Sequence, residues 1–102
     1  MPNFHTEEAG ENLTITLLKD RADAAYAQKA KPELRRILQN TQCEQVEIQM
    51  EKVGFIDSSG IGLLLNILRR FPDKVTLKET TPQVQAVLTL LRLDKLFQTA
   101  RN

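Results

Sequence analysis

Two serine hydroxyls stand at the start of a predicted helix, in the run Asp57-Ser58-Ser59-Gly60. The apolar segment Val53–Ile56 precedes this run, so the run predicts the end of a strand and the first turn of a helix, with Asp57 or Ser58 as the cap. Gly60 and Gly62 are poor helix formers, and their presence in a first turn predicts that something approaches the backbone closely there. The residues after the turn that recur at helical spacing predict its buried face: Ile61, Leu64, Leu65, Leu68 and Phe71.

The other reactive side chains of the chain disfavour an enzyme. A serine hydrolase would carry Gly-x-Ser-x-Gly, whereas Ile56 stands two residues before Ser58. The sequence contains no phosphate-cradling Gly-x-x-x-x-Gly-Lys motif. The only histidine, His5, lies in a weak edge strand without the companions that a metal site needs. We therefore expect no catalysis, no cofactor and no metal.

Composition limits the remaining function classes. With 102 residues, 26% charged residues and a net charge of +1, we expect one domain over residues 1–102 that does not bind nucleic acid directly. The longest apolar run, Ile61–Leu65, is far shorter than the roughly 20 residues of a membrane span. The N-terminus lacks the pattern of a secretion signal, and the single cysteine, Cys43, excludes an internal disulfide. These features predict a cytoplasmic protein that has no contact with membranes.

Alternation of apolar and polar residues predicts the sheet. The expected strands are Leu13–Leu17, Val46–Met50 and Val75–Leu77, with a short edge strand at Phe4–Thr6. Helices are expected over Ala22–Asn40, after Asp57, and from Pro82, with Val84, Val87, Leu88 and Leu91 as the buried stripe of the last one. Pro32 predicts either a kinked first helix or two helices. We expect Leu93, Leu96 and Phe97 to fold back onto the core.

The order β-β-α-β-α-β-α predicts an α/β domain with a mostly parallel sheet of four strands. Because the strands alternate instead of being apolar throughout, we expect the helices mainly on one face. The fixed hand of the crossovers then requires strands to be added in one direction. Parallel strands end at one edge of the sheet, which is where ligands and partners of such sheets bind.

Three loops lie at that edge, namely Lys19–Asp23, Val53–Ser59 and Glu79–Thr81. We call these three loops the loop edge. Asp23 and the Asp57 turn are far apart in sequence, and this arrangement predicts that they are neighbours in space.

These residues resemble a known family. The segment Phe55-Ile-Asp-Ser-Ser-Gly-Ile-Gly62 after a strand, the upstream Asp23, and the closing Leu93-Asp-Lys-Leu-Phe97 are similar to the STAS domain, and within it to the bacterial anti-sigma factor antagonists. The resemblance implies that a GHKL-type kinase, itself the anti-sigma factor, phosphorylates Ser59, with Ser58 as the alternative. It implies that the unphosphorylated form binds this kinase and releases the sigma factor. A PP2C-type phosphatase would reset the cycle, and the free chain would be a monomer.

The resemblance also implies which residues contact the kinase: Arg21, Asp23, Asp57, Ser58, Gly60, Ile61 and Gly62. A phosphate on Ser59 could be held by free N–H groups of the helix N-terminus. Simpler interpretations remain beside this one, because Asp23 could be only a helix cap and the glycines could only permit close packing. A STAS-type binding module outside sigma control, such as a transporter accessory subunit or a small-ligand sensor, is the alternative function.

Overall fold

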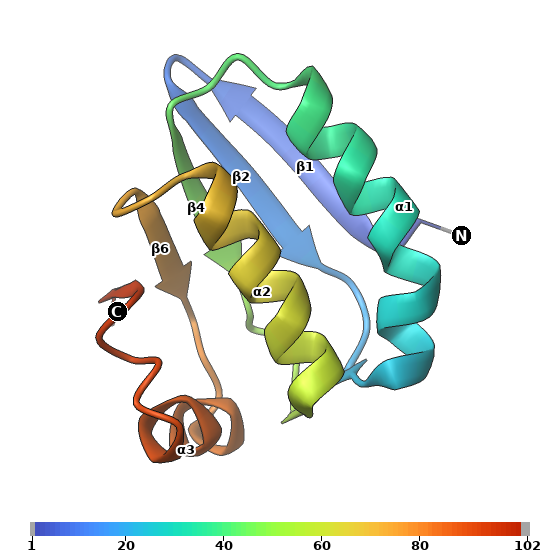
Figure 1. Ribbon diagram of the computed structural model, residues 1–102, viewed down its shortest axis with the longest axis vertical. Coiled ribbons are helices and arrows are strands. Elements are labelled where there is room, and N and C mark those ends of the chain that lie inside the picture. The colour runs from blue at the N-terminus through green and yellow to red at the C-terminus, as the bar shows by residue number, and fades with distance from the viewer. Residues whose placement is uncertain (1, 101–102) are drawn as a thin grey trace.

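The chain folds into a β-sheet that carries two neighbouring helices, α1 and α2, on one face (Figure 1). The computed structural model describes residues 2–100, and for residues 98–100 it describes the backbone alone. The strands are β1 (Phe4–Ala9), β2 (Asn12–Leu17), β3 (Arg21–Ala22), β4 (Gln45–Gln49), β5 (Phe55–Ile56), β6 (Val75–Lys78) and β7 (Gln98–Ala100). The helices are α1 (Ala24–Asn40), α2 (Ser58–Arg70) and α3 (Pro82–Leu90).

The strand order confirms the predicted fold class. The main sheet runs β1-β2-β4-β6-β7, in which β1 pairs antiparallel with β2 and every later pair is parallel. Each crossover therefore adds its strand on the same side, as the fixed crossover hand requires. Gly10, at φ 61°, makes the tight turn between β1 and β2. Strand β7 extends the four predicted strands at the far edge, in a segment where the sequence predicts only a polar tail.

The core lies on one face of the sheet, as the alternation predicts. Leu13, Ile15 and Ile48 are buried beneath the helices, together with Val46, Val75 and Leu77 from the neighbouring strands. The opposite face carries polar side chains that stay partly exposed: Thr14, Thr16, Glu47, Gln49, Thr76 and Lys78. Because only one face is apolar, only one face of the sheet is covered by α1 and α2.

Helix α1 is a single helix with Pro32 inside it, so of the two alternatives predicted at this proline the division into two helices is wrong. It begins after Asp23, whose carboxylate accepts the N–H of Tyr26 at 3.0 Å, and it continues through Pro32 to Asn40. Tyr26, Ala30 and Leu34 bury one face of the helix. Burial of this face offsets the backbone hydrogen bond that the proline removes.

The buried stripes of α2 and α3 differ in part from the predictions. In α2 the predicted Ile61 and Leu64 are buried, but Leu63 and Ile67 are buried too, whereas Leu65 and Leu68 are only partly covered. Helix α3 lies below the end of β6, to one side of α1 and α2 (Figure 1). Leu91 follows the last residue of α3 and is 52% exposed, so its predicted place in the buried stripe is wrong. The predicted packing of Leu96 is also wrong, since its side chain is 50% exposed. Phe97 is buried, as predicted.

Among residues 2–100, no helix combines the length and the apolar character that crossing a membrane requires.

Candidate functional site

Two very short strands, β3 and β5, join the loops after β2 and β4. They pair in parallel, with Arg21 opposite Phe55 and Ala22 opposite Ile56. The carbonyl oxygen of Asp20 accepts the N–H groups of Gly54 at 2.8 Å and Phe55 at 3.1 Å. This pairing brings two segments more than thirty positions apart into one surface, which confirms the prediction that Asp23 and the Asp57 turn are neighbours.

The third loop of the loop edge is held by a side chain. Thr81 donates its hydroxyl to the carbonyl oxygen of Val53 at 2.8 Å, and the same oxygen atom of Thr81 accepts the N–H of Val84 at 3.4 Å to cap α3. One threonine thus starts α3 and fixes the segment that leads to Ser59.

Arg21 and Asp23 form a charged pair on this surface. The Nε of Arg21 donates to Oδ2 of Asp23 at 3.2 Å, and both side chains remain partly exposed. The N–H of Tyr26 beside the carboxylate, helped by Arg21, holds the pKa of Asp23 below its ordinary value. Asp23 is therefore a helix cap that also presents one carboxylate oxygen at the surface.

Phe55 is a surface residue of this site that the sequence analysis missed. Its ring is 40% exposed, and the guanidinium of Arg21 lies 4.1 Å from its centroid. A partner-binding surface commonly uses an exposed aromatic residue of this kind. The sequence alone carried no clear signal for it, because only the pairing with β3 makes Phe55–Ile56 a strand, in which Ile56 faces inward and Phe55 outward.

Asp57 is the cap of α2. One oxygen, Oδ1, accepts the N–H of Ser59 at 2.8 Å and the N–H of Gly60 at 3.2 Å. The prediction that the first-turn N–H groups are free for a phosphate is therefore wrong at these two positions, because a carboxylate already occupies them.

The two serines differ in their surroundings. Ser58 is exposed at the first position of α2, while Ser59 is half-buried and lines a hollow between α1 and α2. Both hydroxyls stand at the positive end of the helix. Ser59 shares its hollow with residues of α1, among them Lys31 and Arg35.

Gly60 and Gly62 have different structural roles. Gly60 is buried, and a Cβ atom added there would overlap the carbonyl oxygen of Ala22 and lie 2.8 Å from Cγ1 of Ile56. Nothing lies within 4 Å of a Cβ added at Gly62, which lines the hollow beside Ser59. The neighbouring Ile61 is buried. Gly60 and Ile61 thus shape the surface from beneath, whereas Gly62 forms part of it.

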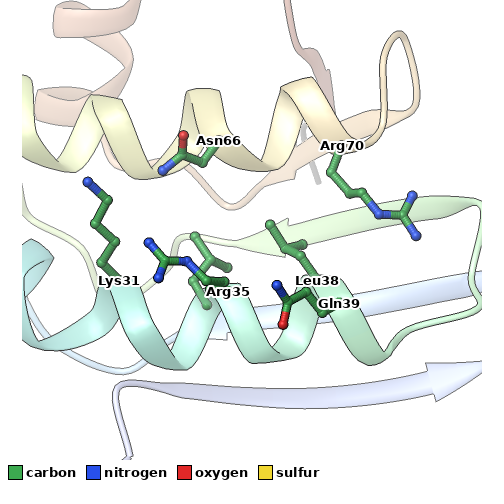
Figure 2. A pocket seen from close by; sticks show the side chains of 7 residues that line it. Lys31, Arg35, Leu38, Gln39, Asn66 and Arg70 are labelled. Atoms are coloured by element: carbon green, nitrogen blue, oxygen red, sulfur yellow. The ribbon is translucent and has the colours of Figure 1, made fainter.

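The hollow beside Ser59 continues along the helices as a groove, which the sequence analysis also missed. We call the space between α1 and α2 the helix groove. Its far part is lined by Lys31, Arg35 and Asn66, which Figure 2 shows between the two helices, together with Leu34, Leu38, Gln39 and Arg70. Arg35 and Arg70 are exposed, and no sequence pattern indicates that the helix faces that carry them meet.

Other reactive side chains of the described residues lie apart from this site. Residues 2–100 contain no group of three His, Cys, Asp or Glu side chains that could hold a metal ion. His5 is exposed on β1, with Nε2 at 3.0 Å from Glu7 Oε1. Cys43 is a buried free thiol.

Comparison with known proteins gives the same fold. An anti-sigma-factor antagonist (STAS) domain protein from Planctomyces limnophilus has a TM-score of 0.87 at 19% identity, over 100% of this chain and 92% of that one. An anti-sigma factor antagonist from Mycobacterium paratuberculosis has a TM-score of 0.80 at 15% identity, over 94% and 82%. The anti-sigma factor antagonist SpoIIAA in its unphosphorylated form has a TM-score of 0.76 at 21% identity, over 95% and 87%. The STAS domain family model matches residues 5–102, and the chain therefore belongs to the STAS domain family.

Proposed function

We propose that this chain is an anti-sigma factor antagonist whose binding to an anti-sigma factor kinase is switched off by a phosphate on Ser59. The observation that carries the proposal is the pairing of β3 with β5, which makes one surface of two distant loops. That surface carries Arg21 and Asp23 at the start of α1, and the Asp57 carboxylate, which accepts the N–H of Ser59, at the start of α2.

Relatives with the same fold support this proposal. SpoIIAA is an anti-sigma factor antagonist that has been solved both unphosphorylated and in the phosphorylated form. The phosphorylated form has a TM-score of 0.68 with this chain at 21% identity. A function in partner switching is also consistent with a surface that offers charged and aromatic contacts without a cluster of catalytic groups.

The modification requires a hydroxyl that a kinase can reach. The Oγ of Ser59 attacks the terminal phosphorus of a nucleoside triphosphate held by the kinase, the nucleoside diphosphate leaves, and the hydroxyl proton is released. Ser59 is favoured over Ser58 because the resemblance to the anti-sigma factor antagonists implies modification of the second serine of the turn. Ser58 serves as the matched control for this choice.

A phosphate would then prevent docking by charge and size. It adds about −1.5 to −2 charges and three acceptor oxygens at pH 7. This charge lies close to the Asp57 carboxylate, so a partner surface that accommodates a neutral hydroxyl there meets repulsion and a steric clash. A loss of about 3 to 4 kcal/mol of binding free energy weakens affinity a few hundredfold, which is sufficient for a switch.

On this proposal the chain is a substrate and a binding protein, not an enzyme. Its partners are a GHKL-type kinase that acts as the anti-sigma factor and a PP2C-type phosphatase that removes the phosphate. The surface residues in contact with the kinase are Arg21, Asp23, Phe55, Asp57, Ser58 and Gly62, supported from beneath by Gly60 and Ile61.

The test is capture of the partner with four forms of the chain. The unmodified protein and Ser59→Ala are expected to retain a GHKL-type kinase from the source cells, while Ser59→Asp is expected to lose it. Ser58→Asp, which adds the same charge one residue away, should retain more of the kinase than Ser59→Asp. Retention by Ser59→Asp equal to that of Ser59→Ala, or recovery of transporter subunits in place of a kinase, would overturn the proposal.

A further inference from the structure

The helix groove begins at Ser59 and extends toward the C-terminal ends of α1 and α2. Two adjoining hollows, of about 670 Å³ and about 400 Å³, share Lys31, Arg35 and Asn66 in their linings. Ser59 and Gly62 line the first hollow, so the groove opens directly beside the hydroxyl that the proposed function assigns to phosphorylation. The shared lining shows that the two hollows lie side by side along the helices.

The charges in this groove have one sign. Four cationic residues and no Asp or Glu line the two hollows, the cations being Lys31, Arg35, Arg69 and Arg70. Within residues 2–100, neither Lys31 nor Arg35 forms an ion pair. Positive charges gathered without a counter-charge repel one another, so an anion placed between them is favoured.

The orientation of the side chains strengthens this point. Figure 2 shows the Lys31 ammonium reaching toward α2 beside Asn66, and the Arg35 guanidinium turned back toward Lys31 and the N-terminal half of the groove. The Oδ1 of Asn66 accepts from Nη1 of Arg69 at 2.6 Å, so the Asn66 amide offers the groove its N–H donors. The polar groups that face this part of the groove are thus predominantly donors.

A phosphate on Ser59 needs partners, and the N–H groups of Ser59 itself and of Gly60 already have one. The Oδ1 of Asp57 takes the N–H groups of both Ser59 and Gly60. The charged donors that line the same hollow are the side chains of Lys31, Arg35 and Arg69. A lysine or arginine side chain is long enough to move toward a neighbouring phosphate without a change in the fold.

We propose that the helix groove is a phosphoryl-binding site and that it receives the phosphate of Ser59 through Lys31 and Arg35. This inference rests on the proposed function only for the presence of the phosphate. It assigns to α1 a part in the switch, because the phosphate then links the first turn of α2 to the cations of α1 and covers the mouth of the groove.

Its test uses a chain with phosphoserine installed at position 59 during synthesis, so that no kinase is needed. The ³¹P resonance is followed against pH to give the second pKa of the phosphate, which is about 6 in a free phosphoserine. Nearby cations favour the dianion, so we expect this pKa to be lower in the folded chain than in the same chain unfolded by denaturant. The double variant Lys31→Gln/Arg35→Gln should raise it again by about half a pKa unit or more.

The matched control is Lys29→Gln/Arg36→Gln. It removes the same two charges from the same helix, but Lys29 lines neither hollow and Arg36 faces a different depression beside Thr6 and Glu8. The control should keep the lowered pKa. All four substituted side chains are exposed, so both double variants should fold, which circular dichroism verifies.

Equal pKa values in the two double variants would overturn the inference, because the lowering would then come from the helix N-terminus or from net charge. The proposed function is tested separately, by kinase capture. If the phosphorylated chain loses the kinase but the two double variants have equal phosphate pKa values, the proposed function stands and the phosphoryl-binding site is rejected. If the phosphorylated chain keeps the kinase but the pKa values differ as expected, the binding site stands and the proposed function is rejected.

Discussion

The backbone N–H of Asp57 donates to the carbonyl oxygen of Ala22 at 3.2 Å, so the residue that caps α2 is bonded to the residue next to the cap of α1. Asp23 follows Ala22 directly, and the two capping aspartates therefore belong to one hydrogen-bonded unit. The first turns of both helices and the Ser59 hydroxyl are positioned by this unit. The predictions below test its parts.

The close contact at Gly60 predicts opposite effects of alanine at the two glycines of α2. A Cβ at Gly60 would meet the Ala22 backbone, so Gly60→Ala should lower the free energy of unfolding by about 1 to 3 kcal/mol. Gly62 has open space, so Gly62→Ala should raise it by about 0.5 to 1 kcal/mol through better helix propensity. Urea denaturation measures both. Equal stability of the two variants would contradict the packing of α2 on β3.

The hydrogen bonds by which Asp57 caps α2 can be tested separately from its negative charge. Asp57→Ala leaves two N–H groups without their acceptor and should cost about 1 kcal/mol of folding stability. Asp57→Asn keeps a side-chain oxygen at the cap and should remain within about 0.5 kcal/mol of the original chain. Denaturation curves of the two variants check this. If Asp57→Asn is as unstable as Asp57→Ala, the charge and not the acceptor geometry holds the turn.

The carboxyl of Asp23 predicts a dependence of stability on pH. Its pKa is lowered in the folded chain from an ordinary value of 3.8, first by the N–H of Tyr26 and also by Arg21. A lowered pKa contributes stability that is present above the unfolded pKa and is lost as the pH falls through the folded pKa. Asp23→Asn should therefore show a smaller loss of stability than the original chain between about pH 4 and pH 2. Acid titrations of the two proteins, run in parallel, check this. A constant difference in stability between the two proteins over this pH range would contradict the assignment to Asp23.

The exposed ring of Phe55 predicts a residue that matters for docking more than for folding. Phe55→Ala removes an aromatic contact and the partner of the Arg21 guanidinium, so affinity for the captured kinase should fall about tenfold or more. Leu90→Ala is the control, since Leu90 is 82% exposed but lies outside the loop edge. Isothermal titration calorimetry measures the affinity of both variants for the kinase. Equal affinities of the two variants for the kinase would show that Phe55 does not contribute to docking.

The order of the long elements was predictable because each one carries its own periodic pattern. Alternation identified β2, β4 and β6, and it indicated one covered face, since Thr14 and Glu47 point away from the helices. The Asp57 turn was equally readable, because capping is a local interaction. Pro32 left one helix and two helices both possible, because the burial of Tyr26 and Leu34 that keeps α1 continuous is a tertiary contact.

The features that were not predicted depend on contacts between distant segments. Strands β3 and β5 have two residues each and no periodicity, so only their pairing defines them. The helix groove exists because one-directional strand addition sets α1 beside α2, and the sequence does not indicate that Lys31 and Asn66 then share a lining. The exposed position of Phe55 depends in the same way on the pairing of β5 with β3.

The central claim is that one phosphate decides whether a partner binds. The most direct measurement is the affinity of the captured GHKL-type kinase for the chain carrying phosphoserine at position 59, compared with the unmodified chain under the same conditions. A dissociation constant raised a few hundredfold, corresponding to about 3 to 4 kcal/mol, is the expected result. An unchanged dissociation constant would contradict the account.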